Sequence, residues 1–129
     1  MNEENPYILM VDDSAIVSKR LAAMLHETGI PWRVAWAHNY DQAMDMMMAE
    51  TSAPAVIVLD INLPGKTGLD LLRTIKAMHR QVTVVMLTNQ VENYYRQLAC
   101  HLGADHFLDK SNDFEQLPGL LYNLVYPRK

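Results

Sequence analysis

Short apolar runs alternate with longer amphipathic segments along the chain, and this alternation constrains the fold more than any other feature. Apolar runs with the length of strands cover residues 7–11, 55–59 and 82–87; residues 32–36 alternate in a way that predicts a strand with unequal faces, and residues 105–109 predict a short fifth strand. Short apolar runs are typical of strands buried in a parallel sheet. Segments with apolar residues at helical spacing follow each of them, and they predict helices over residues 14–28, 39–50, 69–78, 91–102 and 113–125.

Five strand–helix units in this order predict an α/β fold. Short connections favour right-handed crossovers, so we expect an open parallel sheet with helices on both faces, a doubly wound arrangement. The chain has 129 residues, and half of them are hydrophobic. Both values suit one globular domain over residues 1–129. We expect nothing to be attached after the last helix. The alternative is that the chain is a fragment of a longer protein.

Composition excludes several classes of protein. The chain has 11 Lys and Arg against 15 Asp and Glu, a net charge of -4, which argues against direct nucleic-acid binding. No apolar run approaches the roughly 20 residues of a membrane helix, and the polar N-terminus lacks the pattern of a signal peptide. We therefore expect a cytoplasmic protein. The one cysteine, Cys100, excludes an internal disulfide, and we expect it to pack inside the fourth helix.

Polar or charged residues follow four of the five predicted strands. They are Asp12 and Asp13 after the first strand, Asp60 after the third, Thr88 after the fourth and Lys110 after the fifth. Ligands of such sheets bind at the carboxyl ends of the strands. The sequence therefore predicts that these five residues form one site.

The residue types at this edge suit phosphoryl transfer. Carboxylates that share a cleft repel one another, and Mg²⁺ with oxygen ligands relieves that repulsion. Lys110 and Thr88 would stabilise the charge on a transferring phosphoryl group. An ionised Asp60 would then be the nucleophile, as in other aspartyl-phosphate chemistry.

This ordered set resembles the receiver domain of two-component response regulators, in architecture the single-domain, chemotaxis-type members. Pro64 and Gly68 match the family's loop after the third strand, and Gly103 and Ala104 match its turn before the fifth. The resemblance covers nearly the whole chain, from about Tyr7 to Val125. It implies a flavodoxin-like (βα)5 fold with strand order 2-1-3-4-5.

The resemblance also implies roles for individual residues. Asp60 would accept a phosphoryl group from a sensor histidine kinase or a histidine phosphotransfer protein. Asp13, Asp60 and the backbone carbonyl of Asn62 would ligate Mg²⁺, with Asp12 acting mostly through water. Receivers do not turn over a substrate, so the chain would not be an enzyme, although it would catalyse its own phosphorylation and dephosphorylation.

A conformational switch is a further implication. Thr88 and Lys110 would bind the phosphoryl oxygens, and Phe107 at the aromatic switch position would rotate inward when Thr88 moves. The face of the fourth helix, fifth strand and fifth helix would then change its affinity for an unknown downstream protein, with a phosphorylation-dependent homodimer also possible. Neither nucleic acid nor a membrane is implied as a direct partner. An aromatic in a strand more often simply packs, which is the alternative for Phe107.

Two positions depart from the family's pattern. Ser111 stands where the family usually has a proline, and Asn89 is larger than the usual alanine or serine. Because of them, a receiver-like scaffold that is never phosphorylated stays an alternative. Asn62 and Gln90 lie where the family tunes hydrolysis of its aspartyl phosphate, and two amides there can hold a water.

Other functions are less well supported. A metal-dependent phosphatase with an aspartyl nucleophile generally needs a second carboxylate, two residues after the nucleophile, as its general acid and base. This chain has Asn62 at that position. A flavin-type cofactor binder would need a glycine-rich phosphate loop, which the sequence lacks. The five histidines show no metal spacing, and we expect none at a strand end with the acids. Tyr94 and Tyr95 cannot both face inward.

Overall fold

The computed structural model describes residues 5–49, 53–78 and 81–127. It contains one five-stranded parallel sheet with the strand order β2-β1-β3-β4-β5, which confirms the predicted fold and order. The strands are β1 (Tyr7–Val11), β2 (Arg33–Ala37), β3 (Val56–Leu59), β4 (Thr83–Thr88) and β5 (His106–Asp109). The helices are α1 (Ala15–His26), α2 (Tyr40–Ala49), α3 (Gly68–Met78), α4 (Asn93–His101), the 3-10 turn η1 (Phe114–Gln116) and α5 (Leu117–Val125).

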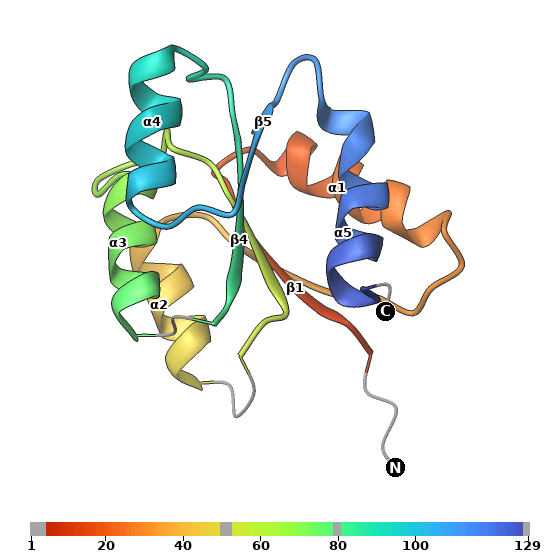
Figure 1. Ribbon diagram of the computed structural model, residues 1–129. Helices are drawn as coiled ribbons and strands as arrows, with labels where there is room; N and C mark the ends of the chain where they lie inside the picture. Colours follow the sequence, from red (N-terminus) through yellow and green to blue (C-terminus); the bar gives the residue numbers. More distant parts are fainter. Residues whose placement is uncertain (1–4, 50–52, 79–80, 128–129) are drawn as a thin grey trace.

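Helices cover both faces of the sheet and bury two separate cores. Figure 1 shows α2, α3 and α4 on one face and α1 and α5 on the other. The first core joins Leu9 and Ile57 to helix residues such as Leu71. The second joins alternate strand residues such as Ile8 to Leu21 of α1. β1 and β3 are buried throughout, which is why their sequences read as unbroken apolar runs.

The register of the central strands brings two predicted site residues to the same level. Val11 pairs with Leu59 at the end of the β1–β3 ladder. The Asp60 amide continues this ladder by donating to the Val11 carbonyl (3.1 Å), and the Asp12 amide continues the β1–β2 ladder by donating to the Ala37 carbonyl (3.0 Å). Strand pairing therefore fixes where both acidic residues leave the sheet.

The last helix begins later than its apolar pattern predicts. The sequence predicts a helix from Asp113, whereas the structure has η1 first and then α5 from Leu117. Pro118 explains the difference, because its ring clashes with a carbonyl four residues earlier and it has no N–H to donate. It is tolerated only in the first turn of α5, where it lies.

Two surface predictions have opposite outcomes. Tyr94 is 67% exposed while Tyr95 packs against the first core, as predicted. The prediction for Cys100 is wrong: its thiol lies exposed on α4, and the neighbouring Ala99 is the buried residue. Consecutive helix residues point in directions about 100° apart, so a shift of one position moves a side chain off the buried face.

Among the described residues, no helix combines the length and the apolar character that crossing a membrane requires.

Candidate functional site

Three carboxylates converge at the carboxyl edge of the sheet, where the sequence predicts them. One oxygen from each of Asp12, Asp13 and Asp60 lies within 4.8 Å of the others. Asp12 is 1% and Asp60 5% exposed, whereas Asp13 is open to solvent. The cluster therefore has a buried floor and one accessible ligand.

Lys110 reaches this cluster from the end of β5. Its ammonium Nζ lies 2.7 Å from Oδ2 of Asp12 and 2.7 Å from Oδ2 of Asp60. The contact with Asp60 is a charged hydrogen bond, and the contact with Asp12 is an equally short ion pair. One ammonium thus bridges two buried carboxylates.

Burial and pairing act against each other on the charges of this site. Burial raises the pKa of Asp12, and the Lys110 ammonium and the Ser14 amide only partly offset it. Burial also disfavours the charged form of Lys110, but its contacts with Asp12 and Asp60 outweigh burial and raise the pKa of the ammonium. The lysine is therefore held charged, beside carboxylates whose negative charge it does not fully neutralise.

The donor set fits a hard divalent cation. Oδ2 of Asp12 is buried, and its charged contact is the Lys110 ammonium at 2.7 Å. Oδ1 of the same residue accepts from the Ser14 amide (2.8 Å), and Oδ1 of Asp60 accepts from the Asn62 amide (3.2 Å). Clustered carboxylate oxygens are the ligands that Mg²⁺ prefers. These acidic residues are thus suited to hold it.

Thr88 and two amide side chains border the cluster. Thr88 is fully buried at the end of β4, and its carbonyl accepts from the Lys110 amide (2.9 Å). The Thr88 hydroxyl accepts from the Gln90 backbone amide (3.1 Å), and the Gln90 side chain donates to Oδ1 of Asn62 (3.3 Å). The structure therefore brings together both amides that the sequence places beside the site.

Phe107 lies on β5 between the core and solvent. Its ring is half-buried, packs against the first core, and is covered by the Arg96 guanidinium at 4.7 Å from the ring centroid. Arg96 also donates from Nε to the Val91 carbonyl (3.2 Å). The ring is thus linked through one arginine to the loop that follows Thr88 and Gln90.

The structure adds two residues that the sequence reading missed, Trp36 and His38. The indole N–H of Trp36 donates to the Asp12 carbonyl (2.7 Å), and the His38 ring stacks on the indole at 3.9 Å. The prediction that no histidine lies at a strand end is therefore wrong, although His38 is not part of the cluster of Asp12, Asp13 and Asp60. The signal was available, because His38 directly follows β2 just as Asp12 directly follows β1.

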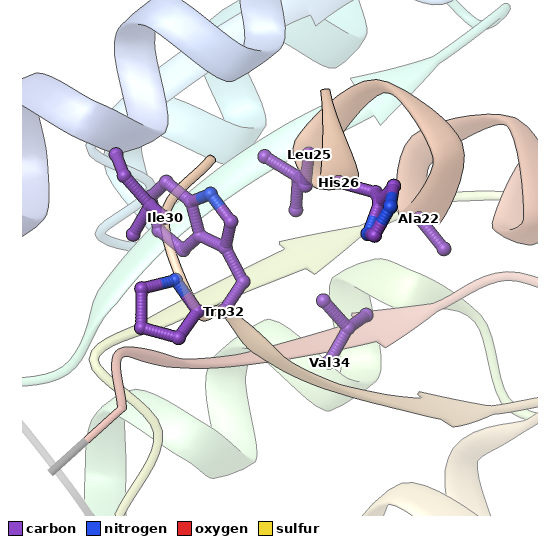
Figure 2. Close-up of a pocket in the computed structure, with 7 residues that line it drawn as sticks. Ala22, Leu25, His26, Ile30, Trp32 and Val34 are labelled. Atoms are coloured by element: carbon purple, nitrogen blue, oxygen red, sulfur yellow. The ribbon is translucent and has the colours of Figure 1, made fainter. Parts of the chain in front are cut away.

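A second hollow lies at the opposite end of the sheet. Figure 2 shows the residues that line it, between the end of α1 and the start of β2. Its volume is about 320 Å³. Its lining is mostly apolar and carries neither a carboxylate nor a lysine: Ala22, Leu25, His26, Ile30, Pro31, Trp32 and Val34. It takes no part in the acidic site.

Comparison with known proteins agrees with this arrangement of residues. Residues 8–121 match the family described as the response regulator receiver domain. The chain belongs to this receiver family. The resemblance inferred from the ordered strand ends is thereby confirmed.

Curated relatives of this receiver domain are transcriptional regulators by name. CpxR of Escherichia coli (strain K12) is 35% identical over 109 residues, which are 84% of this chain and 44% of CpxR. AruR of Pseudomonas aeruginosa is 31% identical over 123 residues, 93% of this chain and 49% of AruR. The chain thus spans somewhat less than half the length of these relatives.

Solved structures show the same fold. The receiver domain of the Francisella response regulator 1452 has a TM-score of 0.84 at 22% identity, covering 97% of this chain and 100% of its own. The beryllofluoride-activated DrrB receiver domain has a TM-score of 0.83 at 23% identity, covering 95% and 99%. The non-phosphorylated HemR receiver domain of Leptospira biflexa has a TM-score of 0.83 at 26% identity, covering 97% and 98%.

Gly68 of this receiver domain lies against the backbone of the predicted phosphoacceptor. A Cβ added there would overlap the Asp60 carbonyl and come within 3 Å of Cα of Ile61. The Gly68 amide also donates to the Ile61 carbonyl (2.8 Å). No side-chain rotation relieves an overlap with backbone atoms, so only glycine permits this approach.

We therefore expect Gly68→Ala to lower the free energy of unfolding by about 2–3 kcal/mol through overpacking. Gly119→Ala is the matched control, because nothing lies within 4 Å of its added Cβ and alanine favours the α5 helix. Urea titration of both variants measures the difference. An unchanged or higher stability of Gly68→Ala would contradict the close approach at Asp60.

Proposed function

We propose that this chain is a phosphorylation-switched signalling receiver in which Asp60 accepts a phosphoryl group. The observation that carries the proposal is the buried Asp60 carboxylate, paired with Lys110 and clustered with Asp12 and Asp13 at one sheet edge. Membership of the receiver family supports it. The donor would be the phosphohistidine of a sensor histidine kinase or a histidine phosphotransfer protein, in the cytoplasm.

The transfer would be an in-line displacement at phosphorus. A carboxylate oxygen of Asp60 attacks, the P–N bond of the phosphohistidine breaks, and the leaving imidazole keeps the electron pair of that bond. Lys110 offers a positive charge and Thr88 a hydroxyl to the phosphoryl oxygens as negative charge shifts onto them. The Lys110 ammonium is already held beside the nucleophile and needs little rearrangement, whereas Thr88 would move toward the phosphoryl group.

Mg²⁺ would be held by Asp13, Asp60 and the backbone carbonyl of Asn62, with Asp12 acting through water. When bound, it neutralises the carboxylates and the phosphoryl oxygens so that the two negative groups can approach. The clustering of Asp12, Asp13 and Asp60 and the exposure of the Asp13 carboxylate support this assignment.

The output would be a change in protein contact on the α4–β5–α5 face. Phe107 would leave its place under Arg96 as Thr88 moves toward the phosphoryl group. The curated relatives extend well beyond the matched region, so the proposed output of the residues present here is contact with a downstream protein or a second copy.

The lifetime of the aspartyl phosphate would depend on the amides of Asn62 and Gln90. They lie 3.3 Å apart beside the site, where together they orient an attacking water. We expect Gln90→Ala to lengthen the half-life of the phosphorylated protein about threefold to tenfold. Gln97→Ala, an exposed glutamine on α4, is the control. A half-life that is unchanged or shorter, followed by intact mass over time, would exclude this role.

The proposal as a whole is tested by intact mass. The purified protein is incubated with Mg²⁺ and a small phosphodonor such as acetyl phosphate, with and without a chelator. We expect the mass of one phosphoryl group to be gained with Mg²⁺ and lost with the chelator. An unmodified protein that still binds Mg²⁺, and that also forms no beryllofluoride complex, would instead favour an unphosphorylated scaffold.

A further inference from the structure

Lys110 has a long, flexible side chain, yet its ammonium touches two carboxylates at 2.7 Å. Holding a lysine in one rotamer costs conformational entropy, so the backbone that carries it must itself be ordered. At Lys110 the β4–β5 ladder contributes the hydrogen bond from the Lys110 amide to the Thr88 carbonyl. Beyond this bond, one backbone hydrogen bond and several side-chain hydrogen bonds within residues 109–113 order the chain.

Residues 109–113 form a turn closed by two aspartates. The Asp113 amide donates to the Asp109 carbonyl (2.7 Å), and the Asp109 amide donates to Oδ2 of Asp113 (2.9 Å). The Asp109 carboxylate accepts from the Ser111 amide (2.8 Å) and from the Asn112 side chain (2.9 Å). Lys110 lies inside this turn, so the direction of its side chain is set by the turn.

Ser111 also attaches the turn to the neighbouring loop. Its hydroxyl donates to Oδ1 of Asn89 (2.9 Å), and Asn89 directly follows Thr88. These are the two positions that depart from the receiver pattern in the sequence. The structure shows that they contact each other, next to both groups proposed to bind the phosphoryl oxygens.

We propose that Asp109 and Ser111 are positioning residues that hold the Lys110 ammonium between Asp12 and Asp60. Here side-chain hydrogen bonds restrict the backbone of the turn, as the proline that the family usually has at position 111 would do through its fixed ring. The inference rests on the proposed function only in giving Lys110 a role toward the phosphoryl group. The position of the lysine between two carboxylates is independent of that role.

The proposal has a consequence that general destabilisation lacks. When Lys110 is held less firmly, its positive charge competes less with a cation for the carboxylates, so Mg²⁺ binds more tightly. At the same time the phosphoryl group loses a stabilising charge, so phosphorylation slows. A variant that merely disrupts the site weakens both.

The experiment is a double-mutant cycle with Lys110. Mg²⁺ affinity is measured for Asp109→Ala and Ser111→Ala, each in the wild-type and the Lys110→Ala backgrounds. We expect Asp109→Ala to bind Mg²⁺ about threefold to tenfold more tightly, with a smaller gain for Ser111→Ala, and no further gain in the Lys110→Ala background. Asn123→Ala, an exposed residue on α5, is the unaffected control.

A second measurement needs neither metal nor phosphate. In ¹⁵N-lysine-labelled protein, the Lys110 ammonium signal, assigned by its loss in Lys110→Ala, should exchange faster with water in both variants. Ser111→Ala keeps the test valid where Asp109→Ala fails to fold, because it removes one exposed hydroxyl.

Three results would overturn the inference: an unchanged ammonium signal, weaker Mg²⁺ binding, or an equal gain in the Lys110→Ala background. A wild-type protein that is never phosphorylated would reject the proposed function alone, because the ammonium measurement would still decide the positioning role.

Discussion

Asp60→Asn should gain no phosphoryl group from acetyl phosphate and Mg²⁺, a fall of more than about a hundredfold in the rate of adduct formation. The amide keeps the shape of the side chain but replaces the nucleophilic carboxylate oxygen. It still has an oxygen to accept from the Asn62 amide, as Oδ1 of Asp60 does at 3.2 Å. The loss would therefore reflect chemistry rather than a collapsed loop.

Intact mass and thermal unfolding check this prediction together. Asp45→Asn is the matched control, because it makes the same substitution at an exposed position on α2. We expect the control to be phosphorylated at the wild-type rate. Adduct formation by Asp60→Asn at that same rate would mean that another side chain accepts the group, and the assignment of Asp60 would be wrong.

Lys110→Ala should have the second-largest effect, in two opposite directions. We expect phosphorylation to slow by about a hundredfold, the typical cost of removing a charge that stabilises the transition state. We also expect Mg²⁺ to bind more tightly, because the ammonium that contacts both buried carboxylates no longer competes with it. Lys110→Arg should not restore the rate, because the planar guanidinium of arginine cannot occupy the position of the compact lysine ammonium.

Tryptophan fluorescence provides the Mg²⁺ titration. Trp36 reports on the site because its indole donates to the Asp12 carbonyl, and Trp32→Phe removes the other tryptophan, which lies just before the start of β2. Lys19→Ala, an exposed lysine of α1, is the control. Weaker Mg²⁺ binding by Lys110→Ala would show that the ammonium supports the metal site rather than competing with it.

The same substitution should destabilise the protein when Mg²⁺ is absent. Asp12 and Asp60 would be left as buried acidic groups without a cation, at a cost of about 2–3 kcal/mol. Saturating Mg²⁺ should restore most of that loss, because a ligand that binds only the folded state stabilises it. Denaturant titrations with and without Mg²⁺ measure both quantities, and equal stability in the two conditions would contradict the charge argument.

The fold and the positions of the acidic residues can both be predicted from the sequence, because the same pattern of apolar runs indicates both. β1 and β3 are buried on both faces, so their apolar runs are unbroken, and Asp12 and Asp60 stand out where each run stops. Parallel pairing of β1 and β3 then brings the ends of both runs to the same edge of the sheet. Lys110 was predicted in the same way, from its place at the end of β5.

Features that depend on side-chain pairing between segments could not be read in this way. The bond from Trp36 to Asp12 spans 24 residues, and that from Ser111 to Asn89 spans 22. Neither pair has a periodic signal: the bond from Ser111 depends on how two loops meet, and the bond from Trp36 depends on how its ring reaches from β2 to the residue that follows β1. Asn89 and Ser111 were visible only as separate departures from a family pattern, and their mutual contact required the structure.

The measurement that tests the central claim most directly is the position of the acyl phosphate. The phosphorylated protein is treated with borohydride, which reduces an aspartyl phosphate to homoserine, and is then mapped by peptide mass spectrometry. We expect homoserine at residue 60 only, and none when a chelator is present during phosphorylation. Homoserine at Asp12 or Asp13, or a phosphoryl adduct that leaves Asp60 unmodified, would contradict the account.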